Sequence, residues 1–275
     1  MTLGISNEEV EKCTRTMAAY VLPFITPVTR QESINATEGE ACGSASYFEK
    51  DDRKYIITNE HVSSELSGSE SKSHGYQFYG SSDIYATNAE FASIENPVDV
   101  SIADITAIWN SRAVKTAAKC IPFGKMQGVY NCEPEELYFI AGFPGEGVEM
   151  HFGYLCNKVL NFSTQETNVP TGLSNVNPEY HFALRNDPKD AICTSDAPWS
   201  ALPPPPGVSG SLVWKTNYVN CRKNGIKWNP EKHAVVAGIA CLWDDKHSNV
   251  IIATKIDKMQ INDLTNYLVN QKGEK

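Results

Sequence analysis

Three short segments carry side chains that together could perform nucleophilic catalysis, and the first centres on a histidine. The apolar run Tyr55–Ile57 leads to His61. A general base needs a fixed place at the end of an element, and histidine has the side-chain pKa nearest neutrality. His61 is therefore the candidate base. The other five histidines lack such a setting and are assigned no role: His74, His151, His181, His233 and His247.

The second segment, Pro97–Asp104, contains two acids. An acid that orients a catalytic histidine has to be buried beside it. Asp99 opens an alternating stretch typical of a strand that enters the core, so it is suitably placed. Asp104 is the rival, and on strict alternation the two carboxylates lie on opposite faces of the strand. The two acids therefore cannot serve the same site.

The third segment is a serine-containing turn, Gly207–Ser211. It follows four prolines at 203–206 and precedes an apolar strand that begins at Leu212. A glycine-flanked serine at a tight turn has an uncrowded hydroxyl, and the adjacent main-chain N–H groups point toward one place, as an oxyanion hole requires. By itself such a cluster is more typical of an ordinary turn. Its meaning depends on the other two segments.

The elements that would position these residues are mostly short strands. Ser6 and Glu9 have capping-box spacing and predict a helix after Ser6, and a second helix is predicted over about 260–270, where apolar residues share one face. Between the helices lie nine apolar stretches separated by turn residues, which is typical of an all-β core. They are Ser44–Phe48, Tyr55–Thr58, Tyr76–Tyr79, Val100–Ile105, Leu137–Gly142, Tyr180–Leu184, Ser211–Lys215, Ala234–Trp243 and Val250–Thr254.

Along the chain the candidate residues occur in the order histidine, acid, serine. Chymotrypsin has this order, whereas subtilisin and the α/β-hydrolases do not. The α/β-hydrolase turn also needs a glycine two residues after the serine, where this chain has Ser211. The order of the three segments therefore favours one class of hydrolase over the others.

On these segments the chain resembles the trypsin-like serine peptidases, and among them the bacterial Deg-type and related members without a PDZ module. Residues 41–62 are similar to the family's run up to its catalytic histidine. The stretch Asp99–Ile102 resembles the family's Asp-Ile/Val-Ala-Leu/Val strand, which selects Asp99 as the acid. The turn Gly207–Ser211 resembles the motif Gly-x-Ser-Gly-Gly, with serine in place of the last glycine.

The resemblance covers about residues 38–256 and implies an all-β fold of two packed six-stranded antiparallel β-barrels, with N-terminal and C-terminal helices. The expected division is an N-terminal helix and lead-in strand at 1–37, then a first barrel at 38–120 that carries the histidine and the acid. A second barrel at 121–256 carries the serine, and a C-terminal helix at 257–275 follows.

The resemblance also implies a serine endopeptidase. Ser209 would attack the scissile carbonyl, His61 would move the proton, and Asp99 would orient His61. The main-chain N–H groups of Gly207 and Ser209 would form the oxyanion hole. The substrate is then a protein or a peptide, and neither a cofactor nor a metal is expected.

The residues expected at the substrate pocket are uncharged. Pro203 stands where trypsin-type pockets carry the acid that binds arginine or lysine. Ala240 and Cys241 lie in a strand expected to border the same pocket. We therefore expect the side chain before the scissile bond to be uncharged and small to medium in size.

Composition and charge exclude several other classes. The chain has 275 residues, of which 41% are hydrophobic, and its net charge is −9, with 33 acidic against 24 basic side chains. This is the composition of an ordinary globular protein, and an acidic balance without runs of lysine or arginine argues against nucleic acid as a partner. The sequence shows neither an export signal nor a membrane span.

Eight cysteines are scattered without the close pairs of a zinc site or a disulfide framework. Free thiols in a reducing compartment are the favoured interpretation. Together with the missing export signal, this predicts a cytoplasmic protein.

The alternative from another functional class is a catalytically silent or partner-gated trypsin-like scaffold that acts as a binding or regulatory module. The complete set of His61, Asp99 and Ser209, together with Gly207, favours the enzyme. The N-terminal helix and residues 217–232 are additions to a minimal pair of barrels, and they could contact a regulatory protein partner or form a lid.

Overall fold

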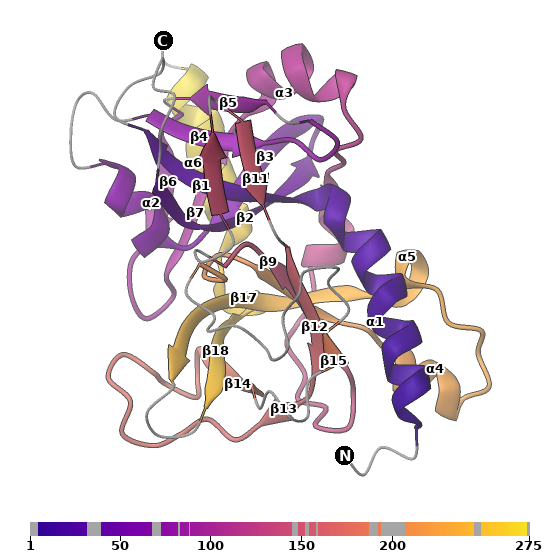
Figure 1. Cartoon of the computed structure of the whole chain (residues 1–275). Helices are drawn as coiled ribbons and strands as arrows, with labels where there is room; N and C mark the ends of the chain where they lie inside the picture. The colour runs from indigo at the N-terminus through magenta and orange to yellow at the C-terminus, as the bar shows by residue number, and fades with distance from the viewer. Residues whose placement is uncertain are drawn as a thin grey trace.

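The chain forms two large β-sheets with helices at their sides (Figure 1). The structure is a computed structural model, and the residues that it describes are 5–31, 40–67, 73–81, 83–87, 89–144, 148–151, 154–157, 159–186, 192–193, 207–244 and 249–273. The chain completes the first sheet before it enters the second. The three candidate segments are therefore divided between the sheets, two on the first and one on the second.

The first sheet has the strand order β5-β4-β1-β2-β3-β7-β6, and β8 is added in parallel to β2. Its other pairs are antiparallel, and apolar residues such as Val28, Tyr47 and Ile56 form a buried cluster from it. The strands are β1 (Ile25–Gln31), β2 (Glu40–Lys50), β3 (Arg53–Thr58), β4 (Ser73–Gln77), β5 (Ile84–Thr87), β6 (Phe91–Ile94), β7 (Val100–Asp104) and β8 (Ile121–Pro122).

The second sheet has the order β13-β14-β18-β17-β16-β9-β12-β15 and is antiparallel throughout. A second buried cluster, with Ile140, Phe162 and Val213 among its members, belongs to this sheet. The strands are β9 (Tyr138–Gly142), β12 (Leu160–Thr164), β13 (Glu166–Thr167), β14 (His181–Arg185), β15 (Ile192–Cys193), β16 (Leu212–Lys215), β17 (Val235–Asp244) and β18 (Val250–Lys255), beside a separate hairpin of β10 (Val148–His151) and β11 (Tyr154–Asn157).

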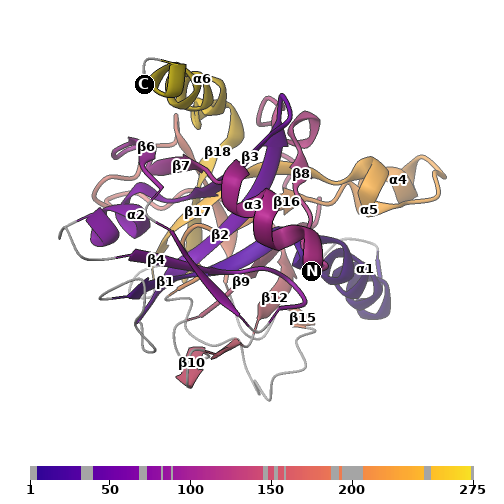
Figure 2. The same cartoon turned by 90° about the horizontal axis from the view of Figure 1, so that it is seen from above.

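Each terminal helix packs on the sheet that is more distant from it along the chain. The first helix, α1 (Asn7–Val21), begins at a capping box of Ser6 and Glu9 and contacts β9, β12 and β15 of the second sheet. The last helix, α6 (Ile261–Gly273), contacts β6 and β7 of the first sheet. Figure 2 shows the two helices on opposite sides of the molecule. A third buried cluster includes residues of both sheets and both helices, so one continuous core joins the two halves.

Within the described residues, four further helices lie in connections, where no helix was expected. They are α2 (Glu60–Ser67), α3 (Thr106–Arg112), α4 (Tyr218–Lys223) and α5 (Pro230–His233), and single 3₁₀ turns occur at Leu22–Phe24, Ala113–Lys115, Phe123–Met126 and Ile256–Lys258. In the part of the chain that the structure describes, no helix has the length and apolar character needed to cross a membrane.

The predicted all-β architecture of two sheets with a helix at each end is confirmed, and all nine predicted strands are present with somewhat different ends. Within the described residues each sheet contains eight strands, where the prediction had six. Among the additional strands, β8, β13 and β15 have only two residues, which is too short for any periodic pattern. The domain boundaries 38–120 and 121–256 remain a prediction.

Candidate active site

His61 and Asp99 make a two-point contact where β3 ends and β7 begins. Nδ1 of His61 lies 2.7 Å from Oδ2 of Asp99, and the main-chain N–H of His61 donates to Oδ1 of Asp99 at 3.0 Å. The Asp99 side chain is only 5% exposed, whereas that of His61 is 42% exposed. A carboxylate at Nδ1 favours the tautomer with its proton on Nδ1, which leaves Nε2 to accept a proton.

The pairing of β3 with β7 explains why these residues meet. Thr58 near the end of β3 is paired with Ser101 near the start of β7. In an antiparallel pair, the residues that follow one strand lie beside those that precede the other. His61 is in the first turn of α2, and the first N–H groups of a helix have no partner inside it. The Asp99 carboxylate accepts one of them, and negative charge is favourable at this end of a helix.

Both sheets hold the backbone around Asp99. Asp99 has a positive φ of 53°, in the left-handed region that aspartate adopts more readily than most residues. Nδ2 of Asn59 donates to the Asp99 carbonyl oxygen at 2.8 Å. The hydroxyl of Thr254, on β18 of the second sheet, donates to the Val98 carbonyl oxygen at 2.9 Å. The second sheet thus braces the loop that presents the acid.

Asp104, the rival acid, lies elsewhere. Its carboxylate pairs with Arg53 at 3.0 Å and accepts the main-chain N–H of Thr106 at 2.9 Å, at the start of α3. It is opposite Tyr55, at the end of β7 farther from Asp99. The structure therefore brings Asp99, and not Asp104, to His61.

Ser209 lies in a turn that two glycines with positive φ make, Gly207 at 96° and Gly210 at 87°. The N–H of Ser211 donates to the Val208 carbonyl oxygen at 3.0 Å and closes the turn. The Val208 side chain is buried in the apolar cluster of the second sheet. The turn is thus anchored on the second sheet by an apolar residue directly before Ser209.

Main-chain hydrogen bonds fix this turn from both sheets. From β2 of the first sheet, the N–H of Ser44 donates to the Ser209 carbonyl oxygen at 2.8 Å. From β17 of the second sheet, the Ala240 carbonyl oxygen accepts the N–H of Gly210 at 3.0 Å. A Cβ on Gly210 would lie 2.0 Å from the Ser44 carbonyl oxygen. Only glycine lets the two backbones approach so closely.

Gly43 shows how near the serine turn lies to the histidine segment. A Cβ on Gly43 would lie 2.9 Å from a methyl carbon of Val62 and 3.0 Å from the Ser209 carbonyl oxygen. Val62 directly follows His61 in α2. The serine turn and the start of α2 therefore flank the same point of β2, an arrangement suited to a nucleophile and a base that act on one substrate.

Of the three residues predicted at the substrate pocket, Pro203 lies outside the described residues. Ala240 is in β17 and exchanges main-chain hydrogen bonds with the serine turn. Cys241 follows it, and its Sγ lies 3.4 Å from the Ile252 carbonyl oxygen. Burial raises the pKa of the Cys241 thiol to about 12, and the negative charge of Asp99 adds to the rise. This thiol therefore stays protonated and uncharged near neutral pH.

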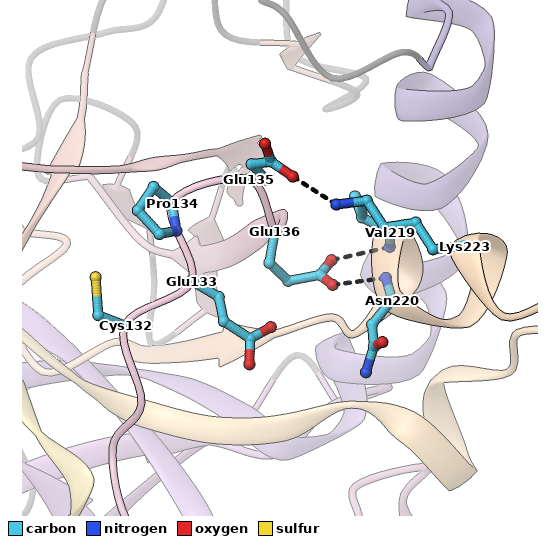
Figure 3. Close-up of a pocket in the computed structure, with 8 residues that line it drawn as sticks. All are labelled: Cys132, Glu133, Pro134, Glu135, Glu136, Val219, Asn220 and Lys223. Carbon is cyan, nitrogen blue, oxygen red and sulfur yellow. Dashed lines mark hydrogen bonds and ion pairs between the residues drawn. The ribbon is translucent and has the colours of Figure 1, made fainter.

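A separate cavity of about 290 Å³ lies between the loop before β9 and α4, and no predicted site residue lines it (Figure 3). The buried carboxylate of Glu136 accepts the N–H groups of Val219 and Asn220, each at 3.1 Å, at the start of α4. Glu135 pairs with Lys223 at 2.5 Å. Both acids therefore bind groups of the added segment that contains α4, and they hold this segment against the loop before β9. No periodic pattern or motif in the sequence indicates this cavity.

Among the described residues, no group of three or more His, Cys, Asp and Glu side chains is arranged to hold a metal ion. Five cysteines are free thiols, in agreement with the prediction for them: Cys13, Cys120, Cys132, Cys221 and Cys241.

No protein-family model and no curated protein sequence matches this chain. Solved structures do match it. The serine endoprotease from Yersinia pestis has a TM-score of 0.50 and 16% identity over 94% of this chain and 66% of that one. Deg5 has a TM-score of 0.50 and 13% identity over 97% of each chain. The MamO protease domain from Magnetospirillum magneticum has a TM-score of 0.49 and 14% identity, covering 89% of this chain and 97% of that domain. At such identities the similarity concerns the fold, and this chain has the chymotrypsin-like two-barrel fold of the trypsin-like serine proteases.

Proposed function

We propose that this chain is a serine endopeptidase that cleaves protein or peptide substrates. The observation that carries the proposal is the two-point contact of the buried Asp99 carboxylate with His61. A carboxylate that binds both the ring and the main chain of a histidine sets its tautomer and its orientation, as a general base requires. The serine turn flanks the same point of β2 as the start of α2, and the fold neighbour named a serine endoprotease supports the same class.

In the proposed reaction, Nε2 of His61 takes the proton of Ser209 as Oγ attacks the scissile carbonyl carbon. The carbonyl oxygen becomes an oxyanion, which the N–H groups of Gly207 and Ser209 stabilise. His61 then donates its proton to the leaving amine, and the acyl group remains on Ser209. Water attacks the acyl-enzyme with His61 again as the base, which releases the second product.

For specificity, we propose an uncharged, small to medium side chain before the scissile bond. The support is the uncharged character of Ala240 and Cys241, because the raised pKa of the Cys241 thiol keeps it neutral. A peptide-library cleavage profile tests this, and a strong preference for arginine or lysine would contradict it.

A fluorophosphonate probe with intact-mass analysis tests the activity itself. The wild-type chain should gain one probe adduct, which peptide mapping should place on Ser209, and Ser209→Ala should gain none. Ser211→Ala is a matched control, since this serine lies in the same turn but its buried hydroxyl makes no hydrogen bond among the described residues. A folded wild-type chain that neither reacts with the probe nor cleaves any peptide would instead indicate a silent or partner-gated scaffold.

A further inference from the structure

We propose that Ser44 is a positioning residue that holds the oxyanion loop, residues 207–209, in its working conformation. The inference rests on the proposed function. Ser44 lies on β2 of the first sheet, fully buried, whereas the loop belongs to the second sheet. Nothing in the sequence pattern distinguishes Ser44 from the other small residues of its strand.

The Ser44 hydroxyl joins two segments of the second sheet. It donates to the Gly207 carbonyl oxygen at 2.8 Å, and it accepts the main-chain N–H of Phe143 at 2.9 Å. A hydroxyl has one hydrogen to donate. Because the N–H of Phe143 occupies its acceptor side, the hydrogen of Ser44 is directed to Gly207. The direction of this hydrogen bond is thus set by the contacts on both sides of Oγ.

All three carbonyl groups of the loop are thereby fixed. The Ser44 hydroxyl binds that of Gly207, the N–H of Ser211 binds that of Val208, and the N–H of Ser44 binds that of Ser209. In a trans peptide the N–H points away from the preceding carbonyl group, so a fixed carbonyl also fixes the direction of the next N–H. The hydrogen bond at Val208 therefore sets the direction of the Ser209 N–H.

Gly207 is the residue of this loop that most needs a restraint. Glycine populates positive and negative φ almost equally, so the peptide groups on either side of Gly207 could rotate at little cost. A rotation that turned a carbonyl oxygen toward the oxyanion would place two negative centres together. The Ser44 hydroxyl opposes rotation of the peptide group between Gly207 and Val208, and it does so from a buried position, where an unsatisfied Gly207 carbonyl would be costly.

Ser44→Ala tests the proposal through steady-state kinetics on a peptide substrate. An oxyanion forms only in the transition state, so the loss should appear in kcat while KM changes little. Loss of one buried hydrogen bond predicts a fall in kcat of roughly ten- to hundredfold. The affinity for a peptide boronic acid, which places an oxygen in the oxyanion hole, should fall by a similar factor.

Ser46→Ala is the matched control. Ser46 lies two residues farther along β2, on the same face and equally buried, but its hydroxyl has no hydrogen-bond partner among the described residues. Its kcat and boronic acid affinity should match the wild type. Melting temperatures of both variants separate a local effect from a general loss of structure. Ser44→Thr, which keeps the hydroxyl, should restore kcat in part.

The outcomes separate this inference from the function on which it rests. If the wild-type chain cleaves the peptide and Ser44→Ala keeps its kcat and its boronic acid affinity, Ser44 has no positioning role although the function stands. If KM rises in Ser44→Ala while kcat and the melting temperature both fall, the role of Ser44 is merely structural. If the wild-type chain is inert toward probe and peptide, the proposed function fails and the role of Ser44 fails with it.

Discussion

The two halves of the candidate site are held by different means. His61 and Asp99 meet through a charged side chain that binds one ring nitrogen and one main-chain N–H. The turn at Ser209 is held by neutral hydrogen bonds to its carbonyl groups and by glycines that allow close contact with β2. The first half depends on a charge, and the second depends on the absence of side chains. Loss of charge should therefore damage the first with the fold intact, and added atoms should damage the second.

The largest expected effect comes from Asp99→Asn. The asparagine would keep the shape of the side chain but could present an N–H group to Nδ1 of His61 and favour the wrong tautomer. Activity on a peptide substrate should fall on the order of 10⁴-fold, while far-UV circular dichroism stays unchanged. Asp104→Asn is the control, because Asp104 pairs with Arg53 at the end of β7 farther from Asp99. Loss of activity in folded Asp104→Asn with an active Asp99→Asn would reverse the assignment of the acid.

Two glycines that have almost the same φ test whether the serine turn depends on the absence of side chains. Gly210 has a φ of 87° and Gly172 a φ of 89°. Alanine at Gly172 meets no atom within 4 Å, so Gly172→Ala should cost only about 1–2 kcal/mol of backbone strain. Gly210→Ala adds a clash with the Ser44 carbonyl oxygen at 2.0 Å and should cost clearly more. Urea unfolding measures the loss in free energy of unfolding for both variants. Equal losses would show that β2 can shift away from the turn.

A smaller effect, on stability at low pH, is expected from His181, which lies on β14 of the second sheet. Burial lowers the pKa of His181 below its ordinary value of 6.5, although hydrogen bonds to the main chain of Asn177 and Pro97 and the charge of Asp99 oppose this, and Lys255 adds to the lowering. Between the lowered pKa and 6.5, His181 is protonated in the unfolded chain but neutral in the folded one. The contribution of neutral His181 to stability is therefore complete above about pH 6.5 and is lost as the pH falls through its pKa in the folded chain.

His181→Gln removes the side chain that binds this proton. Its melting temperature should therefore fall less than that of the wild type between about pH 7 and pH 5. His233→Gln, at the end of the connection helix α5, provides the comparison for the replacement of a histidine by glutamine elsewhere in the fold. An unchanged slope in His181→Gln would mean that His181 contributes nothing to acid sensitivity.

Patterns among neighbouring residues were enough to predict much of this protein. The capping box of Ser6 and Glu9 spans three residues, and a strand shows its alternation within five or six, so α1 and nine strands could be predicted from local sequence. The segments around His61 and Ser209 were recognisable because their glycines and apolar runs are local too. The two-residue strands and the short connection helices were missed, since they contain less than one full period of any pattern.

The choice between Asp99 and Asp104 shows the limit of local patterns. Alternation establishes that the two acids lie on opposite faces, but not which of them meets a histidine. The antiparallel pairing of β3 with β7 places Asp99 beside the start of α2. Without that pairing, Asp99 is favoured only by its place at the start of an alternating stretch and by the resemblance of that stretch to a family motif.

Local patterns in the sequence therefore predict the longer elements and the chemical groups, whereas the tertiary structure decides which groups lie together. Ser44 reaches Gly207 across 163 positions of the chain, and Thr254 reaches Val98 across 156. The terminal helices likewise pack on the sheets more distant in sequence. No local period relates such residues. They meet only because the apolar core joins both sheets and brings the first half of the chain against the second.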